Sequence, residues 1–175
     1  MVAERLVLEK IIWGCGKRLR VSGITPESIL DGPGLRVVLF VQGCPHRCKG
    51  CHNPSTWDIA GGCEMSISDV EKEVLSRLTS MHRGVTFSGG EPFDQYRELA
   101  ELAIRLKPKV KDIVAYSGYT MDQLVGNELL DTIDYLIDGR FEIDKKDIGL
   151  RWRGSSNQVI WRKVKGIWVK ESDLP

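Results

Sequence analysis

The chain has 175 residues, of which 42% are hydrophobic and 28% are charged, and its formal net charge is +1. A chain of this length and composition is typical of one domain with its own hydrophobic core. Its near-neutral charge argues against a surface built to bind nucleic acid or an anionic membrane.

The N-terminal segment MVAERLVLEKII mixes charged with apolar side chains, so it lacks the continuous apolar core of a signal peptide. The sequence contains no run of about 18 apolar residues, which argues against a transmembrane helix. We therefore expect a cytoplasmic protein. We also expect residues 1–21 to form an N-terminal extension and residues 22–175 to form the functional domain.

The first clear strand signal is residues 35–42 (LRVVLFVQ), which are nearly all apolar and suit a strand buried on both faces. Residues 31–34 (DGPG) have the composition of a turn and precede this strand. Three cysteines, Cys44, Cys48 and Cys51, follow it within eight residues. The cysteines are therefore predicted to lie in a loop just beyond the end of the strand.

Helix and strand signals alternate after the cysteines. Ser68 and Glu71 have the spacing of a capping box, which predicts a helix that extends to about Met81. The later signals predict strands at 84–88, 112–117 and 133–138, a helix that ends before Pro108 and begins near 96, and a short helix capped by Thr120 and Gln123. Two further strands are expected, one in the N-terminal stretch and one at 158–163.

This alternation predicts an α/β fold with right-handed βαβ units and a mostly parallel sheet. A complete eightfold barrel takes roughly 250 residues, so we expect a partial (βα) barrel or an open curved sheet. Functional residues of such folds gather at the carboxyl ends of the strands. The cysteine loop, the Gly89-Gly90-Glu91 loop and the loop at 117–119 are all predicted to meet at this edge.

Clustered thiols in a cytoplasmic chain indicate a metal or redox site rather than a disulfide framework. Structural zinc takes four ligands, and its cysteines commonly occur in pairs. The candidates for a fourth zinc ligand are His46, His52, Cys15 and Cys63. A 4Fe–4S cluster also normally takes four thiolates, so three would leave one iron open to a small ligand. The spacing of Cys44, Cys48 and Cys51 leaves both kinds of site possible.

The same spacing resembles that of the radical S-adenosylmethionine superfamily. Residues 86–92 (TFSGGEP), one βα unit later, are similar to the glycine-rich element of that superfamily. The resemblance implies that Cys44, Cys48 and Cys51 ligate a 4Fe–4S cluster whose open iron binds S-adenosylmethionine. It further implies that an electron from the cluster splits this cofactor into methionine and a 5′-deoxyadenosyl radical.

The resemblance also implies that Gly89, Gly90 and Glu91 hold the methionine end of S-adenosylmethionine. Glycines allow a ligand to approach the backbone closely, and a carboxylate accepts a charge-assisted hydrogen bond from an ammonium. By itself, however, Gly-Gly-Glu is a common turn sequence. Its position one βα unit after the three cysteines is what favours the functional interpretation.

Four further contacts to S-adenosylmethionine are expected from the resemblance. Gly50, Cys51 and His52 would lie near the adenine and contact it mostly through backbone groups, and Ser117 would reach the ribose. The superfamily often has an aromatic residue before the third cysteine, and this chain has Gly50 there. Packing of a side chain on the adenine is therefore not expected at that position.

Other stretches narrow the resemblance to one branch. Residues 31–36 (DGPGLR) and 51–54 (CHNP) resemble the glycyl-radical enzyme activases, and residues 115–120 (AYSGYT) and 150–158 (LRWRGSSNQ) resemble those that act on anaerobic ribonucleoside-triphosphate reductase. The resemblance covers residues 22–160. It implies that the radical removes a hydrogen atom from a glycine of the large reductase subunit. We expect flavodoxin or ferredoxin as the electron donor, and neither nucleic acid nor membrane as a partner.

Three other interpretations stay open. The target could be a different glycyl-radical enzyme, such as one of the formate-lyase type. A radical enzyme with a small-molecule substrate would need a fuller barrel and a dedicated pocket. A zinc-stabilised binding module would have no catalytic activity.

Several other residues are given ordinary structural interpretations. Cys15 and Cys63 are expected to be packing residues or idle thiols, and His46 a loop residue. Arg151 and Arg153 are expected either to contact the partner or a cofactor carboxylate, or to lie on the solvent face of a strand. Asp31 is favoured as a turn residue because Asp is common in such turns. The residues expected in the core or at its rim are Trp161 and Trp168.

Overall fold

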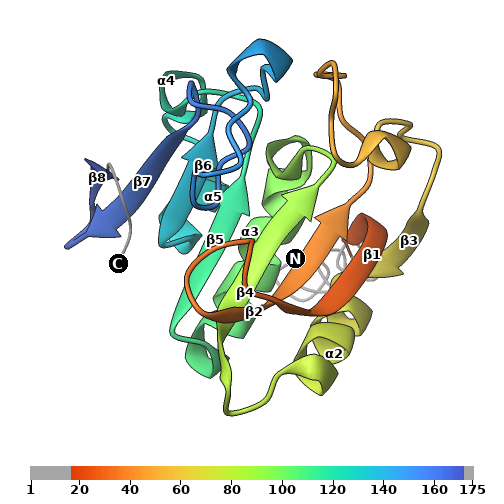
Figure 1. Cartoon of the computed structure of the whole chain (residues 1–175). Coiled ribbons are helices and arrows are strands. Elements are labelled where there is room, and N and C mark those ends of the chain that lie inside the picture. Colours follow the sequence, from red (N-terminus) through yellow and green to blue (C-terminus); the bar gives the residue numbers. More distant parts are fainter. Residues whose placement is uncertain (1–16, 172–175) are drawn as a thin grey trace, which may run out of the picture.

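The computed structural model describes residues 17–171, which build an eight-stranded sheet with its helices on one face (Figure 1). The strands are β1 (Arg18–Ser28), β2 (Leu35–Val41), β3 (Cys63–Ser66), β4 (His82–Gly89), β5 (Asp112–Tyr116), β6 (Tyr135–Asp138), β7 (Val159–Val164) and β8 (Ile167–Glu171). The α-helices are α2 (Ile67–Arg77), α3 (Tyr96–Leu106), α4 (Met121–Leu124) and α5 (Glu128–Thr132). The 3₁₀ turns are η1 (Pro54–Thr56), η2 (Pro92–Gln95), η3 (Lys107–Lys109) and η4 (Ile143–Lys145).

The strand order is β3-β1-β2-β4-β5-β6-β7-β8, which confirms the α/β class and an open sheet. Strands β2, β4, β5 and β6 run parallel, and their carboxyl ends share the upper edge of the sheet in Figure 1. The outer pairs, β3-β1, β1-β2, β6-β7 and β7-β8, are antiparallel. The prediction of a mostly parallel sheet is therefore right only for the four central strands, and barrel character is not confirmed.

The central strands are apolar because both of their faces are covered. In β5, Ile113 and Ala115 join the core cluster beneath the helices, whereas Val114 faces the other side and packs with Tyr135, Ile137 and Ile160. Such alternation follows from the two-residue period of a strand. No helix among residues 17–171 has both the length and the apolar character needed to cross a membrane.

The start of α2 differs from the prediction. Its N-cap is Ser66, whose hydroxyl accepts a hydrogen bond of 3.1 Å from Asp69 N, so the predicted pair Ser68 and Glu71 does not cap this helix. Instead, Glu71 pairs with Arg105 of α3 at 3.2 Å. Since Ser66 also ends β3, the strand passes directly into the helix. The predicted start of α2 was wrong because the capping pattern of Ser68 lies two residues after the true N-cap, Ser66.

The end of α2 also differs. The helix stops at Arg77 instead of continuing to Met81, and Met81 is 78% exposed. Other predictions are confirmed: α3 ends at Leu106, before the predicted stop, and the Gln123 side chain accepts from Thr120 N at 2.9 Å at the start of α4. The strands near 84–88, 112–117, 133–138 and 158–163 are present with slightly shifted ends.

Strand β1 crosses the boundary that was predicted between residues 21 and 22. Its first residues, Arg18 to Val21, pair with β3, so they belong to the sheet rather than to an extension. Residues 1–16, including Cys15, lie outside the described residues, so an N-terminal extension before β1 stays a prediction.

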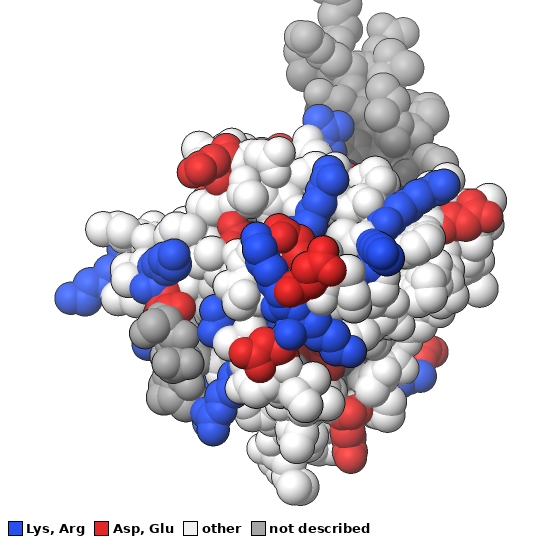
Figure 2. Space-filling view, turned by 45° about the horizontal axis from the view of Figure 1, so that its top comes forward, with Lys and Arg blue, Asp and Glu red and all other residues white. Residues whose placement is uncertain are grey.

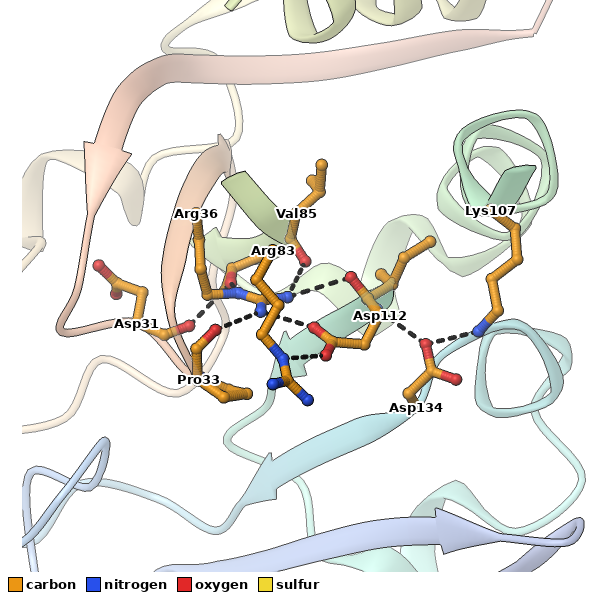
Figure 3. A network of polar contacts seen from close by, with 10 residues as sticks. Asp31, Pro33, Arg36, Arg83, Val85, Lys107, Asp112 and Asp134 are labelled. Carbon is orange, nitrogen blue, oxygen red and sulfur yellow. Dashed lines mark hydrogen bonds and ion pairs between the residues drawn. The ribbon is translucent and has the colours of Figure 1, made fainter. Parts of the chain in front are cut away.

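A buried arginine holds the amino-terminal edge of the central strands together (Figure 3). Arg36, at the start of β2, is fully buried, and burial lowers the pKa of its guanidinium while Asp112 opposes this shift. The acceptors of its N–H groups are Thr86 Oγ1 (2.7 Å), Pro33 O (2.9 Å), Asp112 Oδ1 (2.6 Å), Val85 O (2.8 Å) and Asp112 O (3.2 Å). These bonds engage all five donors of the side chain.

The same network fixes the turn before β2. Thr86 Oγ1 donates to Asp31 O at 2.7 Å, and the Asp31 carboxylate accepts from Ser28 Oγ at 2.5 Å, which confirms a turn role for Asp31. Arg83 donates to Asp112 Oδ2 at 2.6 Å, and this bond raises the pKa of Arg83. Asp112 thus receives two guanidinium groups, and it ties β5 to β2, β4 and the turn.

Replacing Asp112 with alanine should destabilise the protein strongly. The substitution leaves the Arg36 guanidinium buried without its counter-charge, which typically costs about 3–5 kcal/mol. The matched control is Glu71→Ala, which removes a carboxylate from the partly exposed pair with Arg105 and should cost about 1 kcal/mol or less. Urea unfolding of both variants measures the difference, and equal losses would show that the buried network contributes no more than a surface pair.

Candidate functional site

The three cysteines lie in a loop after β2 whose base is closed by hydrogen bonds. Gly43 N donates to Thr56 O at 2.8 Å, and Cys44 N donates to Trp57 O at 3.1 Å. The buried Gln42 side chain donates to the carbonyl groups of Ser55 and Asp58, where the loop returns to the sheet. These contacts fix both ends of the loop while the thiols between them stay partly exposed. We call residues 43–57 the thiol loop.

Cys44, Cys48 and Cys51 line one cavity of about 130 Å³. Burial raises the pKa of the Cys44 thiol, and the Cys51 sulfur accepts a hydrogen bond of 3.3 Å from Asn53 N. Within residues 17–171, no group of three or more His, Cys, Asp and Glu side chains is arranged to hold a single metal ion. Three free thiols on one cavity wall, one with an amide donor, fit a group bound through several thiolates.

Most of the other predicted site residues line the same cavity: Gly89, Gly90, Glu91 and Ser117. Gly50 and His52 do not line it but lie beside it. The His52 ring is tilted against Phe141 with 5.5 Å between ring centroids, and a Cβ on Gly50 would lie 3.4 Å from the Phe141 ring. Phe141 itself lines the cavity, although no pattern in the sequence had indicated it.

The loop after β4 packs directly on the thiol loop. Gly90 N donates to Val41 O at 2.8 Å, and Glu91 N donates to Gly43 O at 2.7 Å. A Cβ on Gly90 would lie 2.2 Å from Gly43 O, and Gly89 has a φ of 98° in the left-handed region that favours glycine. The close approach of the two loops therefore requires glycine at position 90, whereas at position 89 glycine is favoured by the left-handed backbone.

The Glu91 carboxylate is the polar centre of the cavity wall. Its residue is 1% exposed, and its two oxygens accept from donors on three separate loops. The donors are Phe93 N (3.0 Å), Ser117 Oγ (2.9 Å), Gly118 N (2.8 Å) and His46 Nε2 (2.9 Å). Four bonds match the approximate number of lone-pair sites of a carboxylate.

Tyr119 and Asp94 form a hydrogen-bonded pair next to His46. The Tyr119 ring meets the His46 ring edge-on, with 4.5 Å between centroids, and its hydroxyl donates to Asp94 Oδ1 at 2.9 Å. Burial, together with the Asp94 carboxylate, raises the pKa of Tyr119 to about 12. Burial likewise raises the pKa of Asp94. The sequence had placed Tyr119 in a loop at this edge but had indicated neither Asp94 nor the contact between them, because that contact joins two distant loops.

The segment 150–158 folds beside the cavity. The Gln158 side chain accepts from Gly154 N at 2.8 Å, donates to Gly139 O at 3.0 Å and lines the cavity. Arg153 donates to Gln158 O at 3.3 Å, whereas Arg151 is exposed and lines a separate surface groove. Both arginines lie in irregular backbone before β7, so the interpretation that they form the solvent face of a strand is wrong. A contact of Arg151 or Arg153 with the partner or with a cofactor carboxylate stays a prediction.

The remaining candidates lie away from the cavity. Cys63 is exposed at the start of β3, which rules out a packing role and leaves the interpretation of an idle thiol. Trp161 and Trp168 are partly buried against the main core, as predicted. Trp161 Nε1 is buried without a hydrogen-bond partner among the described residues.

The chain was compared with protein families, with named proteins and with solved structures. The family described as "4Fe-4S single cluster domain" matches residues 30–161. A protein of Vibrio cholerae is 40% identical over 146 residues, which cover 78% of this chain and 94% of that protein. A protein of Enterobacteria phage T4 is 39% identical over 150 residues, covering 83% and 95%. A protein of Escherichia coli K12 is 38% identical over 144 residues, covering 77% and 93%.

All three relatives carry the name "Anaerobic ribonucleoside-triphosphate reductase-activating protein". Among solved structures, "Crystal structure of QueE from Escherichia coli" matches with a TM-score of 0.48 and 19% identity, covering 64% of this chain and 57% of that chain.

Replacing Gly90 with alanine should separate the two loops. The new methyl group would overlap Gly43 O, and such overpacking typically costs about 1–3 kcal/mol. The control is Gly23→Ala in β1, where a Cβ meets no atom within 4 Å and the stability should be unchanged or slightly higher. Urea unfolding compares the variants. Equal stability of Gly90→Ala and the wild type would mean that the loops do not pack this closely.

Proposed function

We propose that this chain, which belongs to the family of anaerobic ribonucleoside-triphosphate reductase-activating proteins, installs a glycyl radical on such a reductase. The radical would be generated by radical S-adenosylmethionine chemistry. The observation that carries the proposal is a single cavity shared by the three thiols and the glycine-rich loop. Hydrogen abstraction from a glycine Cα is the chemistry that a bound cluster and S-adenosylmethionine would supply. The protein's own residues bind, orient and shield these groups.

In this proposal, Cys44, Cys48 and Cys51 ligate a 4Fe–4S cluster and leave one iron open. Their common cavity wall and the match to a 4Fe–4S domain family support the assignment. The Asn53 amide would donate a hydrogen bond to the ligating Cys51 sulfur and so help to orient it. The hydrogen-bonded base of the thiol loop would keep the three sulfurs on one side.

Gly89, Gly90 and Glu91 would hold the methionine end of S-adenosylmethionine beside the open iron. The two glycines leave the backbone accessible at the cavity wall, and the Glu91 carboxylate places a negative charge next to them. A cationic ammonium is attracted to such a charge, and the attraction is strong where water is excluded. The fixed donors around Glu91 would keep this charge in one place.

The other end of S-adenosylmethionine would extend toward Gly50, Cys51, His52 and Ser117. His52 packs against Phe141, which lines the cavity, so a planar adenine would find an apolar neighbour there. The Ser117 hydroxyl donates to Glu91 and accepts from Tyr119 N. One lone pair of its oxygen stays available for a ribose hydroxyl.

The open sheet suits a protein substrate. Its terminal strands, β3 and β8, are at opposite ends of the strand order, so a partial barrel would leave a side through which a peptide loop of the large reductase subunit could reach the cavity. Figure 2 shows basic and acidic side chains mixed over the face that it presents. Arg47 and Lys49 are exposed on the thiol loop, next to the cysteines. They would favour an acidic electron donor such as flavodoxin or ferredoxin.

We also propose a domain organisation for the chain. Residues 22–175 would form the activase domain and residues 1–21 an N-terminal extension, with the exception that β1 already begins at Arg18.

Anaerobic electron paramagnetic resonance tests the function. The reconstituted protein is mixed with S-adenosylmethionine, a strong reductant and the anaerobic reductase from the same genome. We expect the doublet of a glycine-centred radical, and we expect Cys48→Ala to abolish it because one cluster ligand is lost. Cys63→Ala is the matched control, since Cys63 is exposed and does not line the cavity, and it should keep the full signal.

Other outcomes would contradict specific parts of the proposal. A cluster signal that shifts with S-adenosylmethionine but gives no glycyl radical would mean that the reductase is the wrong partner. A colourless wild-type protein that binds zinc and shows no cluster signal would favour a binding module.

A further inference from the structure

His46 belongs to the thiol loop, yet its side chain does not face solvent as the neighbouring loop residues do. The side chain is 4% exposed, and Nε2 lies 2.9 Å from Glu91 Oε2. Pro45 and Arg47, on either side, are exposed. The imidazole is therefore directed from the loop of the cysteines to the carboxylate on the loop after β4.

A third loop fixes the position of this imidazole. The Tyr119 ring meets it edge-on at 4.5 Å. Gly118 lies so close that a Cβ there would be 2.3 Å from His46 Cδ2 and 2.6 Å from Nε2. The space beside Gly118 is thus occupied by the His46 ring. Any larger residue at position 118 would push the ring away from Glu91.

The His46 bond has no equivalent among the other bonds to Glu91. Phe93 N is two residues along the same loop, and Ser117 and Gly118 belong to the loop after β5. His46 is the donor that comes from the thiol loop. Without it, one of the four acceptor positions of a nearly buried carboxylate would lose its partner. The side-chain link between the cysteines and Glu91 would be lost at the same time.

We infer that His46 is a positioning residue that orients the Glu91 carboxylate and ties it to the thiol loop. The inference rests on the proposed function, because it makes the binding of S-adenosylmethionine depend on a residue between two cluster ligands. His46 acts through Glu91 and ligates nothing itself. It sets the carboxylate and the thiols in a fixed relation, so that the two parts of the site form one rigid unit.

The test measures the dissociation constant of S-adenosylmethionine for the anaerobically reconstituted protein, together with its iron content. His46→Leu should weaken binding about tenfold, as expected for the loss of a hydrogen bond to a charged group. His46→Gln should restore binding to within about threefold of the wild type, because the glutamine amide can donate near the position of Nε2. Both variants should keep the iron content of the wild type.

Gly118→Ala provides a second variant, in which the Gly118 N–H that donates to Glu91 is itself retained. The added methyl group should displace the His46 ring and weaken binding to a similar extent, although His46 itself is intact. Combining it with His46→Leu should weaken binding no further than either single change, since residues that share one interaction are not additive. The matched control is His82→Leu, because the His82 side chain forms its hydrogen bonds with Thr79 and Pro26 at the start of β4, the end away from the cavity. It should lower the melting temperature and leave the dissociation constant unchanged.

The outcomes separate this inference from the proposed function. Wild-type protein that takes up no iron and binds no S-adenosylmethionine would overturn both. Wild-type protein that binds, with His46→Leu binding equally or more tightly, would overturn only the role of His46. Glutamine that fails to restore binding would also overturn it, since the residue would then serve packing alone. If His46→Leu does not fold, the comparison of Gly118→Ala with His46→Gln decides.

Discussion

A buried carboxylate organises the carboxyl edge of this sheet. Removing the charge of Glu91 from water costs several kcal/mol unless hydrogen bonds replace its hydration, and the chain supplies four donors from three loops. Those loops follow β2, β4 and β5 and are far apart in the sequence. Satisfying one side chain therefore requires all three loops to meet at one point. The thiols, the glycine pair and Ser117 then line a common cavity because they lie next to these donors.

A second buried charge, the Arg36 guanidinium, holds the central strands together at the amino-terminal edge of the sheet. Arg36 begins β2, and its partners Thr86 and Asp112 belong to β4 and β5. In the sheet register Arg36 pairs with Gly84 and Gly84 with Asp112, and a Cβ on Gly84 would lie 2.0 Å from Asp112 O. A shift of one strand by one residue would break this contact and turn each side chain to the other face. The ion pair thus helps to fix the register on which the alignment of the loops depends.

Local patterns predicted the elements that carry strong periodicity or an apolar run, namely α3 and the central strands. They failed where two signals competed within a few residues, as at Ser66 and Ser68, or where a strand was too short to show a period, as in β3. The cysteines and Gly89-Gly90-Glu91 were found because their spacing is itself the signal. The contacts of His46, Tyr119 and Asp94 were not found, although His46 had been considered as a zinc ligand and Tyr119 had been placed in a loop at this edge. A contact between loops leaves no trace in the spacing of either loop.

This difference explains what a short motif does and does not specify. Spacing within one loop determines which side chains can face a common ligand, but it does not fix where the loop lies relative to its neighbours. In this chain that placement comes from close backbone contacts at Gly90 and Gly118 and from the bonds that converge on Glu91. Radical chemistry needs reacting atoms held within a few tenths of an ångström of a productive geometry. A thiol loop attached only at its base would retain freedom at its tip, where Cys48 lies. The His46 bond falls between the first two cysteines, so it restrains the part of the loop that the base contacts do not reach.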